Sequence, residues 1–202
     1  MSYETLYIPG KTGMPLLVMF HGTGGDERQM LELAKAIAPD FGYLSLRGKV
    51  DENGALRYFR RFSERDLDLV DLAFRIEEIG DFLTEMKSTN LELPGHWVLG
   101  GYSNGANVAN MLLQTYPHLA EEAICLRPMN PLQPDPAKDL SGKKFLLLGS
   151  NSDAVTPIEG FHSLKEWLRS CGATVVAEEV PGGHGLTQAD VIASQKFLNL
   201  TQ

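Results

Sequence analysis

The sequence predicts an α/β protein with a mostly parallel sheet and helices on both faces. Two observations support this prediction. Short apolar runs alternate with segments of helical periodicity along the chain. The runs, such as Leu16–Phe20, are continuously apolar, which is typical of strands buried on both faces. We find no internal repeat or low-complexity tract, so a single domain over residues 1–202 is expected.

The first elements are a strand, a helix and a second strand. The strand is expected at Leu16–Phe20. Asp26 and Gln29 then have the spacing of a capping box, apolar residues recur at helical spacing, and Pro39 ends the helix. The second strand is expected at Tyr43–Leu46.

The middle of the chain contains the longest helical pattern. Residues 47–66 are irregular and rich in arginine, and residues 67–87 carry one long apolar stripe, which predicts a helix. A buried strand is expected at Trp97–Leu99. The helix after it covers residues 104–116 and stops at Pro117.

The last third of the chain continues the alternation. A proline-rich stretch at residues 127–143 separates two of its strands. Strands are expected at Ala123–Leu126, Phe145–Leu148 and Thr174–Val180. A helix before the last of these strands is expected to have Thr156 as its cap, Pro157 at its first position and Glu159 completing a capping box, and to end at Gly172. A final helix is expected after Thr187, which caps it.

Composition excludes several classes of protein. The 18 Lys and Arg residues against 26 Asp and Glu residues give a net charge of −8. Binders of nucleic acid or of anionic membranes use basic surfaces, so neither class is expected. Cys125 and Cys171 are too few for a disulfide framework and favour a reducing compartment. The N-terminus has no signal-peptide pattern and no apolar run is long enough to span a membrane, so a cytoplasmic protein without membrane insertion is expected.

A candidate nucleophile lies in the segment Gly101-Tyr102-Ser103-Asn104-Gly105, which fits the pattern G-x-S-x-G. A predicted strand precedes it and a predicted helix follows, as in a nucleophile elbow. Glycines suit this place because bulky side chains would collide with the neighbouring strand and helix. The alternative is a strand-to-helix turn in which Ser103 only caps the helix.

A serine nucleophile needs a general base, and the base needs an orienting acid. Asp153 follows the expected strand Phe145–Leu148, and His184 follows the last strand. Both therefore lie at the same sheet edge as Ser103, in the chain order of serine, acid and base. The alternatives are a turn aspartate and a loop histidine. Other histidines and acids lie in less suitable places: His96, His118, His162, Asp135, Asp139, Glu178 and Glu179.

A glycine-rich loop, residues 21–26, follows the strand Leu16–Phe20. In a site of this type, one backbone N–H for the reaction's oxyanion comes from an early loop and the other from the residue after the nucleophile. We therefore assign the oxyanion hole to the backbone N–H groups of Thr23 and Asn104. A purely structural connection is the alternative. A phosphate-binding loop is disfavoured because its Lys-Ser/Thr pair and glycine spacing are missing.

Together these motifs resemble the carboxylesterase/phospholipase family of small α/β-hydrolases, which includes acyl-protein thioesterases. The resemblance covers nearly the whole chain, and its elbow, Gly-Tyr-Ser-Asn-Gly-Ala, is that of compact bacterial carboxylesterases. Asn104 and Thr23 depart from the eukaryotic thioesterases, which have Gln and Leu there. The matching pieces are residues 21–27, 46–48 and 101–106, Asp153 with Val155 and Pro157, and Gly183-His184.

The resemblance implies an α/β-hydrolase fold and a catalytic triad of Ser103, Asp153 and His184, with no cofactor and no metal. The implied reaction is cleavage of small to medium carboxylic esters through an acyl-enzyme. The partner is then a small-molecule ester, and the protein is expected to be a monomer or a homodimer. A thioesterase, a lysophospholipase-like lipid deacylase and a non-enzymatic binding protein with the same fold are the alternatives.

The substrate side of the site is less well determined. Residues 127–143 are too short to form a large cap domain, so an open site is expected. We assign Arg57 and Phe59 to substrate binding, because residues 57–62 follow a predicted strand at the site edge and arginine suits a carboxylate. Met129, in the proline-rich stretch, is assigned to substrate binding as well. The alternative is that the arginines of this segment pair with surface acids: Glu64, Asp66 and Asp68.

Overall fold

The structure is a computed structural model, and it describes residues 2–64, 66–129 and 138–200. Nine strands and five helices are assigned in this part of the chain. Their order is β1 (Thr5–Ile8), β2 (Leu16–Phe20), α1 (Leu31–Ile37), β3 (Gly42–Leu46), β4 (Val50–Glu52), β5 (Ala55–Arg57), α2 (Leu69–Thr89), β6 (Trp97–Tyr102), α3 (Asn104–Thr115), β7 (Glu122–Leu126), β8 (Lys144–Gly149), α4 (Ile158–Ser170), β9 (Thr174–Glu179) and α5 (Gln188–Phe197).

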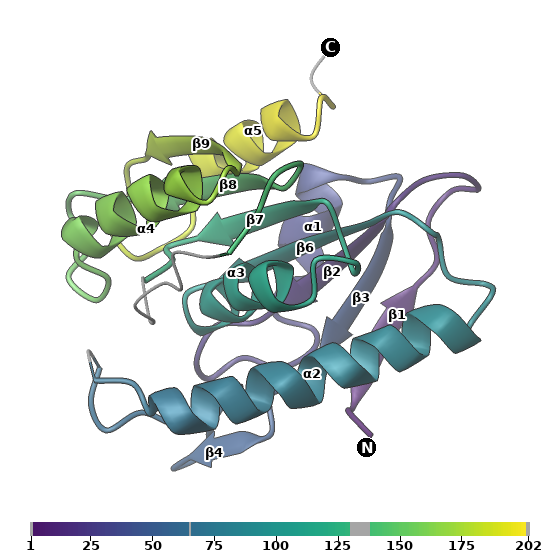
Figure 1. Cartoon of the computed structure of the whole chain (residues 1–202), viewed down its shortest axis with the longest axis horizontal. Coiled ribbons are helices and arrows are strands. Elements are labelled where there is room, and N and C mark those ends of the chain that lie inside the picture. Colours follow the sequence, from purple (N-terminus) through teal and green to yellow (C-terminus); the bar gives the residue numbers. More distant parts are fainter. Residues whose placement is uncertain (1, 65, 130–137, 201–202) are drawn as a thin grey trace.

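A seven-stranded sheet forms the centre of the molecule, in the order β1-β3-β2-β6-β7-β8-β9 (Figure 1). The strand β1 pairs antiparallel with β3, and the other neighbours are parallel. The carboxyl ends of the six parallel strands therefore share one edge, which is where parallel sheets gather their sites. The predicted fold class is confirmed.

Helices cover both faces of the sheet (Figure 1). Residues of α2, α3 and α4 pack in one hydrophobic cluster, and residues of α1 and α5 pack in another. The strand β2 contributes to both: Leu16, Val18 and Phe20 join the first cluster, while Leu17 and Met19 join the second. Alternate side chains point to opposite faces of a strand, so a strand covered on both sides must be apolar throughout.

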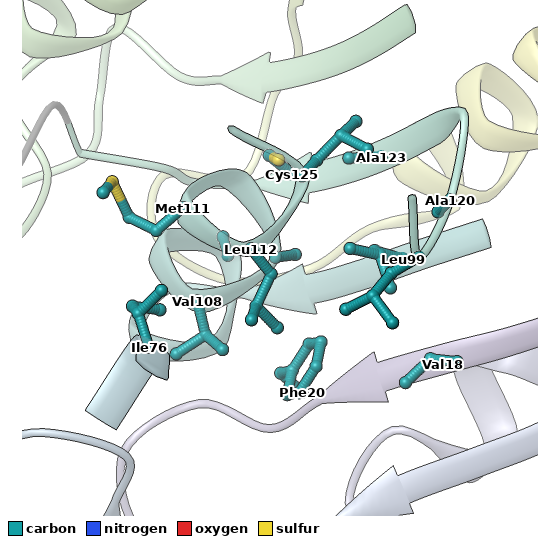
Figure 2. Packing of buried hydrophobic residues seen from close by; sticks show 14 of the residues in the cluster. Val18, Phe20, Ile76, Leu99, Val108, Met111, Leu112, Ala120, Ala123 and Cys125 are labelled. Atoms are coloured by element: carbon teal, nitrogen blue, oxygen red, sulfur yellow. The ribbon is translucent and has the colours of Figure 1, made fainter. Parts of the chain in front are cut away.

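The helix α3 lies at the centre of the larger cluster (Figure 2). Val108 and Leu112 on α3 are fully buried, as are Phe20 on β2 and Leu99 on β6. Burying one such side chain contributes about 1.5–3 kcal/mol. This packing fixes the helix that begins directly after Ser103.

The beginning of α1 differs from the prediction. The capping box at Asp26 and Gln29 is wrong, since the helix begins at Leu31. Asp26 accepts a hydrogen bond from the Arg28 backbone within a turn, and the Gln29 side chain accepts one from the Gly22 N–H. Gln29 thus supports the glycine-rich loop instead of the helix.

The beginning of α4 differs in a similar way. Thr156 was expected as the cap, but Pro157 is the N-cap residue and the helix begins at Ile158. The Thr156 hydroxyl donates to Asp153 instead. For α5 the expectation is confirmed, because Thr187 is the N-cap and forms a capping box with Asp190.

Three short strands were not predicted. The strand β1 is a four-residue edge strand, and β4 and β5 form a separate two-stranded hairpin within the irregular segment. Strands of three or four half-buried residues are too short to show a periodic pattern.

The proline-rich stretch is described only in part, since residues 130–137 lie outside the described residues. The expected single domain and open site remain predictions. In the described ranges, no helix has the length and apolarity that a membrane span requires.

Candidate active site

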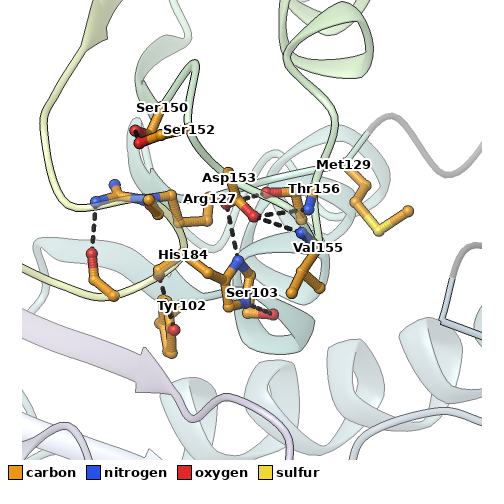
Figure 3. A network of polar contacts seen from close by, with 12 residues as sticks. Tyr102, Ser103, Arg127, Met129, Ser150, Ser152, Asp153, Val155, Thr156 and His184 are labelled. Atoms are coloured by element: carbon orange, nitrogen blue, oxygen red, sulfur yellow. Dashed lines mark hydrogen bonds and ion pairs between the residues drawn. The ribbon is translucent and has the colours of Figure 1, made fainter.

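Three predicted side chains meet at the carboxyl edge of the sheet (Figure 3). Ser103 follows β6, Asp153 follows β8, and His184 follows β9. The structure brings them into one hydrogen-bonded chain, although they are up to 81 residues apart in sequence. The parallel topology explains the meeting, because each residue lies just beyond the end of its strand.

The hydrogen bonds between these three side chains indicate which atom donates and which accepts. His184 Nδ1 lies 2.8 Å from Asp153 Oδ2, and His184 Nε2 lies 3.0 Å from Ser103 Oγ. An ionised carboxylate only accepts hydrogen bonds, so His184 carries its proton on Nδ1 and donates to Asp153. The Nε2 lone pair is then free to accept the Ser103 hydroxyl.

The Asp153 carboxylate accepts four hydrogen bonds from residues that the structure describes. Oδ1 accepts from the backbone N–H of Val155 at 2.8 Å and of Thr156 at 2.9 Å, and Oδ2 accepts from the Thr156 hydroxyl at 2.5 Å and from His184. Burial alone would raise the pKa of Asp153, but the hydrogen bonds from Thr156 and His184 outweigh it, so the net pKa is lowered. Asp153 therefore stays ionised in the folded protein.

Ser103 lies on a strained turn. Its φ is 53° and its ψ is −111°, a backbone conformation that side-chain-bearing residues rarely adopt. The two glycines near it in sequence, Gly101 and Gly105, are required because a Cβ at either position would collide with backbone atoms. A Cβ at Gly101 would lie 2.2 Å from the Gly105 carbonyl oxygen, and a Cβ at Gly105 would lie 2.1 Å from the Phe20 carbonyl oxygen. The segment thus has the geometry of a nucleophile elbow.

The two amides assigned to the oxyanion hole lie at the ends of different elements. Asn104 is the first residue of α3, where a backbone N–H has no partner within the helix. Thr23 lies in the glycine-rich loop after β2. Within the described ranges, neither the Thr23 nor the Asn104 N–H has a hydrogen-bond acceptor.

His21, the first residue of the glycine-rich loop, connects the loop to the segment after β3. Its Nε2 accepts from the Gly48 N–H at 2.9 Å, so the proton is on Nδ1, which donates to the Gly22 carbonyl at 2.7 Å. Burial lowers the pKa of His21, which keeps the ring neutral as this pairing requires. The contribution of His21 is to position the loop.

Tyr58 joins this loop to the elbow, and no motif in the sequence indicated this role. The Tyr58 hydroxyl donates to the Leu46 carbonyl and accepts from the His21 N–H, while the Tyr58 N–H donates to the Asn104 side chain. The hairpin adds a further bond, from the Gly24 N–H to the Leu56 carbonyl. We name the hairpin β4–β5 together with Tyr58, directly after it, the hairpin segment. This unpredicted segment bonds both to the glycine-rich loop and to Asn104, the two places that carry the assigned oxyanion donors.

The residues assigned to substrate binding have different environments. Arg57 is 3% exposed, and its guanidinium donates to the Thr23 hydroxyl at 3.0 Å. Burial and the neighbouring Arg61 lower the pKa of Arg57 to about 10. Phe59 is fully buried in the core, so its ring offers no surface to a substrate. Met129 is partly buried, and its N–H donates to Asn107.

The arginines of this segment all have acidic partners, but these differ from the expected set. Arg60 pairs with Asp68 at 3.1 Å, as expected. Arg57 and Arg61 instead share Glu52 on β4, at 3.5 Å and 2.8 Å. The described part of the chain brings together no group of His, Cys, Asp and Glu side chains that would hold a metal ion.

Comparison with known proteins identifies relatives over nearly the whole chain. A protein of Bacillus subtilis (strain 168) named "Putative hydrolase MhqD" is 38% identical over 182 residues, which cover 90% of this chain and 91% of that protein. No family model matches the chain.

Solved structures with the same fold are also similar in sequence. A carboxylesterase of Bacillus cereus has a TM-score of 0.92 and 33% identity, covering 98% of this chain and 93% of its own. YahD, solved with malic acid, has a TM-score of 0.90 and 30% identity, with both chains covered completely. A carboxylesterase of Mesorhizobium loti has a TM-score of 0.85 and 29% identity, covering 94% of this chain and 90% of its own. The chain is therefore a hydrolase and belongs to the carboxylesterase/phospholipase family of small α/β-hydrolases.

Proposed function

We propose that the protein hydrolyses carboxylic esters of small to medium size through an acyl-enzyme on Ser103. The observation that carries this proposal is the continuous hydrogen-bonded chain from Ser103 through His184 to the buried carboxylate of Asp153. The family membership supports the same class of reaction.

The reaction begins when Ser103 Oγ attacks the ester carbonyl carbon and His184 Nε2 takes the hydroxyl proton. The tetrahedral intermediate collapses, and the alcohol leaves with the proton from Nε2. Water then gives a proton to Nε2 and attacks the acyl-enzyme. The second tetrahedral intermediate collapses, the carboxylic acid leaves, and Nε2 returns its proton to Ser103 Oγ. Asp153 keeps the imidazole in the Nδ1–H form and stabilises its charge when Nε2 is protonated.

The backbone N–H groups of Thr23 and Asn104 are the proposed donors to the oxyanion. Both lack an acceptor among the described residues, and both are held by residues of the hairpin segment. Removing one oxyanion donor typically lowers kcat by about 10²–10³-fold. Arg57 is buried and contributes by holding Thr23 through its hydroxyl, and Met129 remains the proposed contact for the substrate.

Labelling with a fluorophosphonate probe tests the nucleophile. Such probes react with activated serines, so the wild-type protein should be labelled and Ser103→Ala should not. Ser103→Ala should also lower kcat on a small ester by up to about 10⁶-fold. Ser170→Ala is the matched control, because that hydroxyl is exposed on α4 and donates to the Trp167 carbonyl, away from the site. Near wild-type activity of Ser103→Ala would remove the proposal.

A panel of substrates separates the reactions that this site could perform. Esters of increasing acyl length, matched thioesters and a lysophospholipid would be compared by kcat/KM. The proposal expects the highest values for esters with short to medium acyl chains. Preference for thioesters or for the lysophospholipid would assign the protein to a thioesterase or a lipid deacylase on the same triad. A binding protein that retained the fold would show no labelling at all.

A further inference from the structure

The loop that carries His184 has little structure of its own. It follows β9, and Gly182 and Gly183 have φ values of 104° and 61°, which glycine adopts without strain. Glycines have no side chains with which to fix a loop by packing. The position of His184 must therefore come from contacts made by other segments.

Three successive carbonyls of this loop accept hydrogen bonds from side chains. The Gly183 oxygen accepts from Arg127 Nε at 2.7 Å, and the Gly185 oxygen accepts from Arg127 Nη2 at 2.8 Å. Between them, the His184 oxygen accepts from the Tyr102 hydroxyl at 2.9 Å. Figure 3 shows Arg127, Tyr102 and His184 at the site. The backbone of His184 is thus held at its own carbonyl and at both neighbours.

The Arg127 side chain is completely buried, and its guanidinium bonds to the His184 loop and to α5. Arg127 lies directly after β7 and pairs with Asp190 on α5, which is equally buried, at 2.7 Å. Its other bonds are a second contact to Asp190 at 3.2 Å and one to the Leu148 carbonyl at 3.5 Å. The φ of Arg127 is 57°, a strained backbone that surrounding contacts must maintain.

Tyr102 connects the same loop to the nucleophile. It precedes Ser103 in the chain, so its hydroxyl joins the backbone next to the nucleophile to the backbone of the base. Its ring also lies beside the imidazole of His184, with centroids 5.3 Å apart. The separation between Ser103 Oγ and His184 Nε2 is therefore set by two side chains: Tyr102 at the end of β6 and Arg127 directly after β7.

We propose that Arg127 and Tyr102 are positioning residues that hold the backbone of His184 at hydrogen-bonding distance from Ser103. We name the three carbonyl bonds the His184 clamp. The proposal rests on the proposed function, because it assigns a purpose to the position of the general base. The alternative is that the Arg127–Asp190 pair only joins β7 to α5 and contributes stability alone.

Conservative variants separate the two explanations. Tyr102→Phe keeps the ring and removes the hydroxyl bond, and Arg127→Lys keeps a positive charge for Asp190 but loses the planar fork that reaches both glycine carbonyls. Each should lower kcat and the rate constant of fluorophosphonate labelling by about 10–100-fold with KM nearly unchanged, because small displacements of a catalytic group have large effects on rate. Asp190→Asn keeps the carbonyl bonds and should lower kcat much less than Arg127→Lys.

Two further measurements make the result independent of stability and of catalysis. Leu168→Ala removes a buried side chain on α4 far from the loop, and it should lower stability without changing kcat of the folded protein. Backbone hydrogen exchange should become faster at residues 183–187 in Tyr102→Phe and Arg127→Lys. Tyr116→Phe, at the C-cap of α3, is the hydroxyl control, since that group bonds to Asp81.

The outcomes distinguish failure of the clamp from failure of the proposed function. Absence of wild-type labelling would remove the proposed function, whatever the exchange rates are. Normal labelling with wild-type kcat and loop exchange in both Tyr102→Phe and Arg127→Lys would overturn the clamp. Lower stability in Arg127→Lys with unchanged kcat would assign the ion pair to stability alone.

Discussion

Thr156 illustrates how one hydroxyl can serve the proposed site instead of a helix. A Thr-Pro pair before an apolar stripe is a common helix start, yet the Thr156 side chain donates to Asp153. That hydrogen bond and those from the Val155 and Thr156 backbone already hold both carboxylate oxygens, and His184 adds one more bond at Oδ2. The orientation of Asp153 is therefore independent of the base that it is proposed to orient.

Thr156→Val tests the effect of this bond on pH-dependent stability. The pKa of Asp153 is lowered in the folded protein, so ionisation of Asp153 stabilises the fold above the unfolded pKa, and this stability is lost as pH falls through the folded pKa. Without the hydroxyl, the folded pKa should rise. We expect a loss of about 1–3 kcal/mol at pH 7, shrinking towards pH 3, measured by chemical denaturation. Thr89→Val, on the exposed end of α2, should show no such pH dependence.

The three proposed catalytic side chains were predictable because their order and their places after strands could be read directly from the sequence. Their supporting residues were not. Tyr58 lies in an irregular segment, and Arg127 is a single charged residue after an apolar strand. Neither type of residue has a local signal for its role, since the partners of Tyr58 lie 12 to 46 residues away and those of Arg127 lie 21 to 63 residues away.

At the scale of elements, the close crossing of α3 over β2 decides which residues the elbow accepts. The carbonyl oxygen of Phe20, the last residue of β2, lies only 2.1 Å from the position that a Cβ of residue 105 would take. The first turn of α3 can approach the sheet only because Gly105 has no side chain. This approach also places the Asn104 N–H close to the carboxyl edge of the sheet.

Gly105→Ala should therefore be destabilising, although alanine normally favours a helix over glycine. The added methyl group collides with backbone atoms that cannot move aside, so we expect a loss of about 1–3 kcal/mol or more in denaturant unfolding, together with lower activity. Gly95→Ala is the control, because its Cβ would meet no atom within 4 Å. Equal stability of the two variants would contradict this account of the elbow.

Elements were predicted well where burial alone determines them. The strand Leu16–Phe20 is apolar at every position and was predicted to the residue. Helix starts were predicted less well. Gln29 and Thr156 are capping residues by type, but their side chains bond to loop residues that precede the helices, Gly22 and Asp153. A capping residue type therefore does not locate the helix start where the preceding loop offers its side chain another hydrogen bond.

At the scale of the whole molecule, the acidic net charge conceals a paired arginine cluster. Arg57 and Arg61 share Glu52, and Arg60 pairs with Asp68 and lies 3.7 Å from Asp71. These pairs tie the hairpin to itself and the segment after it to the start of α2. The cluster thus organises the surroundings of the glycine-rich loop.

Both cysteines report on the integrity of the fold. Cys125 on β7 is fully buried, Cys171 at the end of α4 is 6% exposed, and burial raises the pKa of the Cys125 thiol. Neither should react with a thiol reagent at pH 8 under native conditions, and two thiols per chain should react in denaturant. Fast labelling of Cys125 without denaturant would show that the larger cluster opens locally.

The parallel topology has a consequence for synthesis of the chain. His184 follows Ser103 by 81 residues and Asp153 by 31 residues, so it is the last of the three to leave the ribosome. A nascent chain that ends before β9 has the proposed nucleophile and acid but not the proposed base, and Arg127 then lacks the Gly183 and Gly185 carbonyls and Asp190. If the three residues act as proposed, the site can be completed only after most of the sheet has been made.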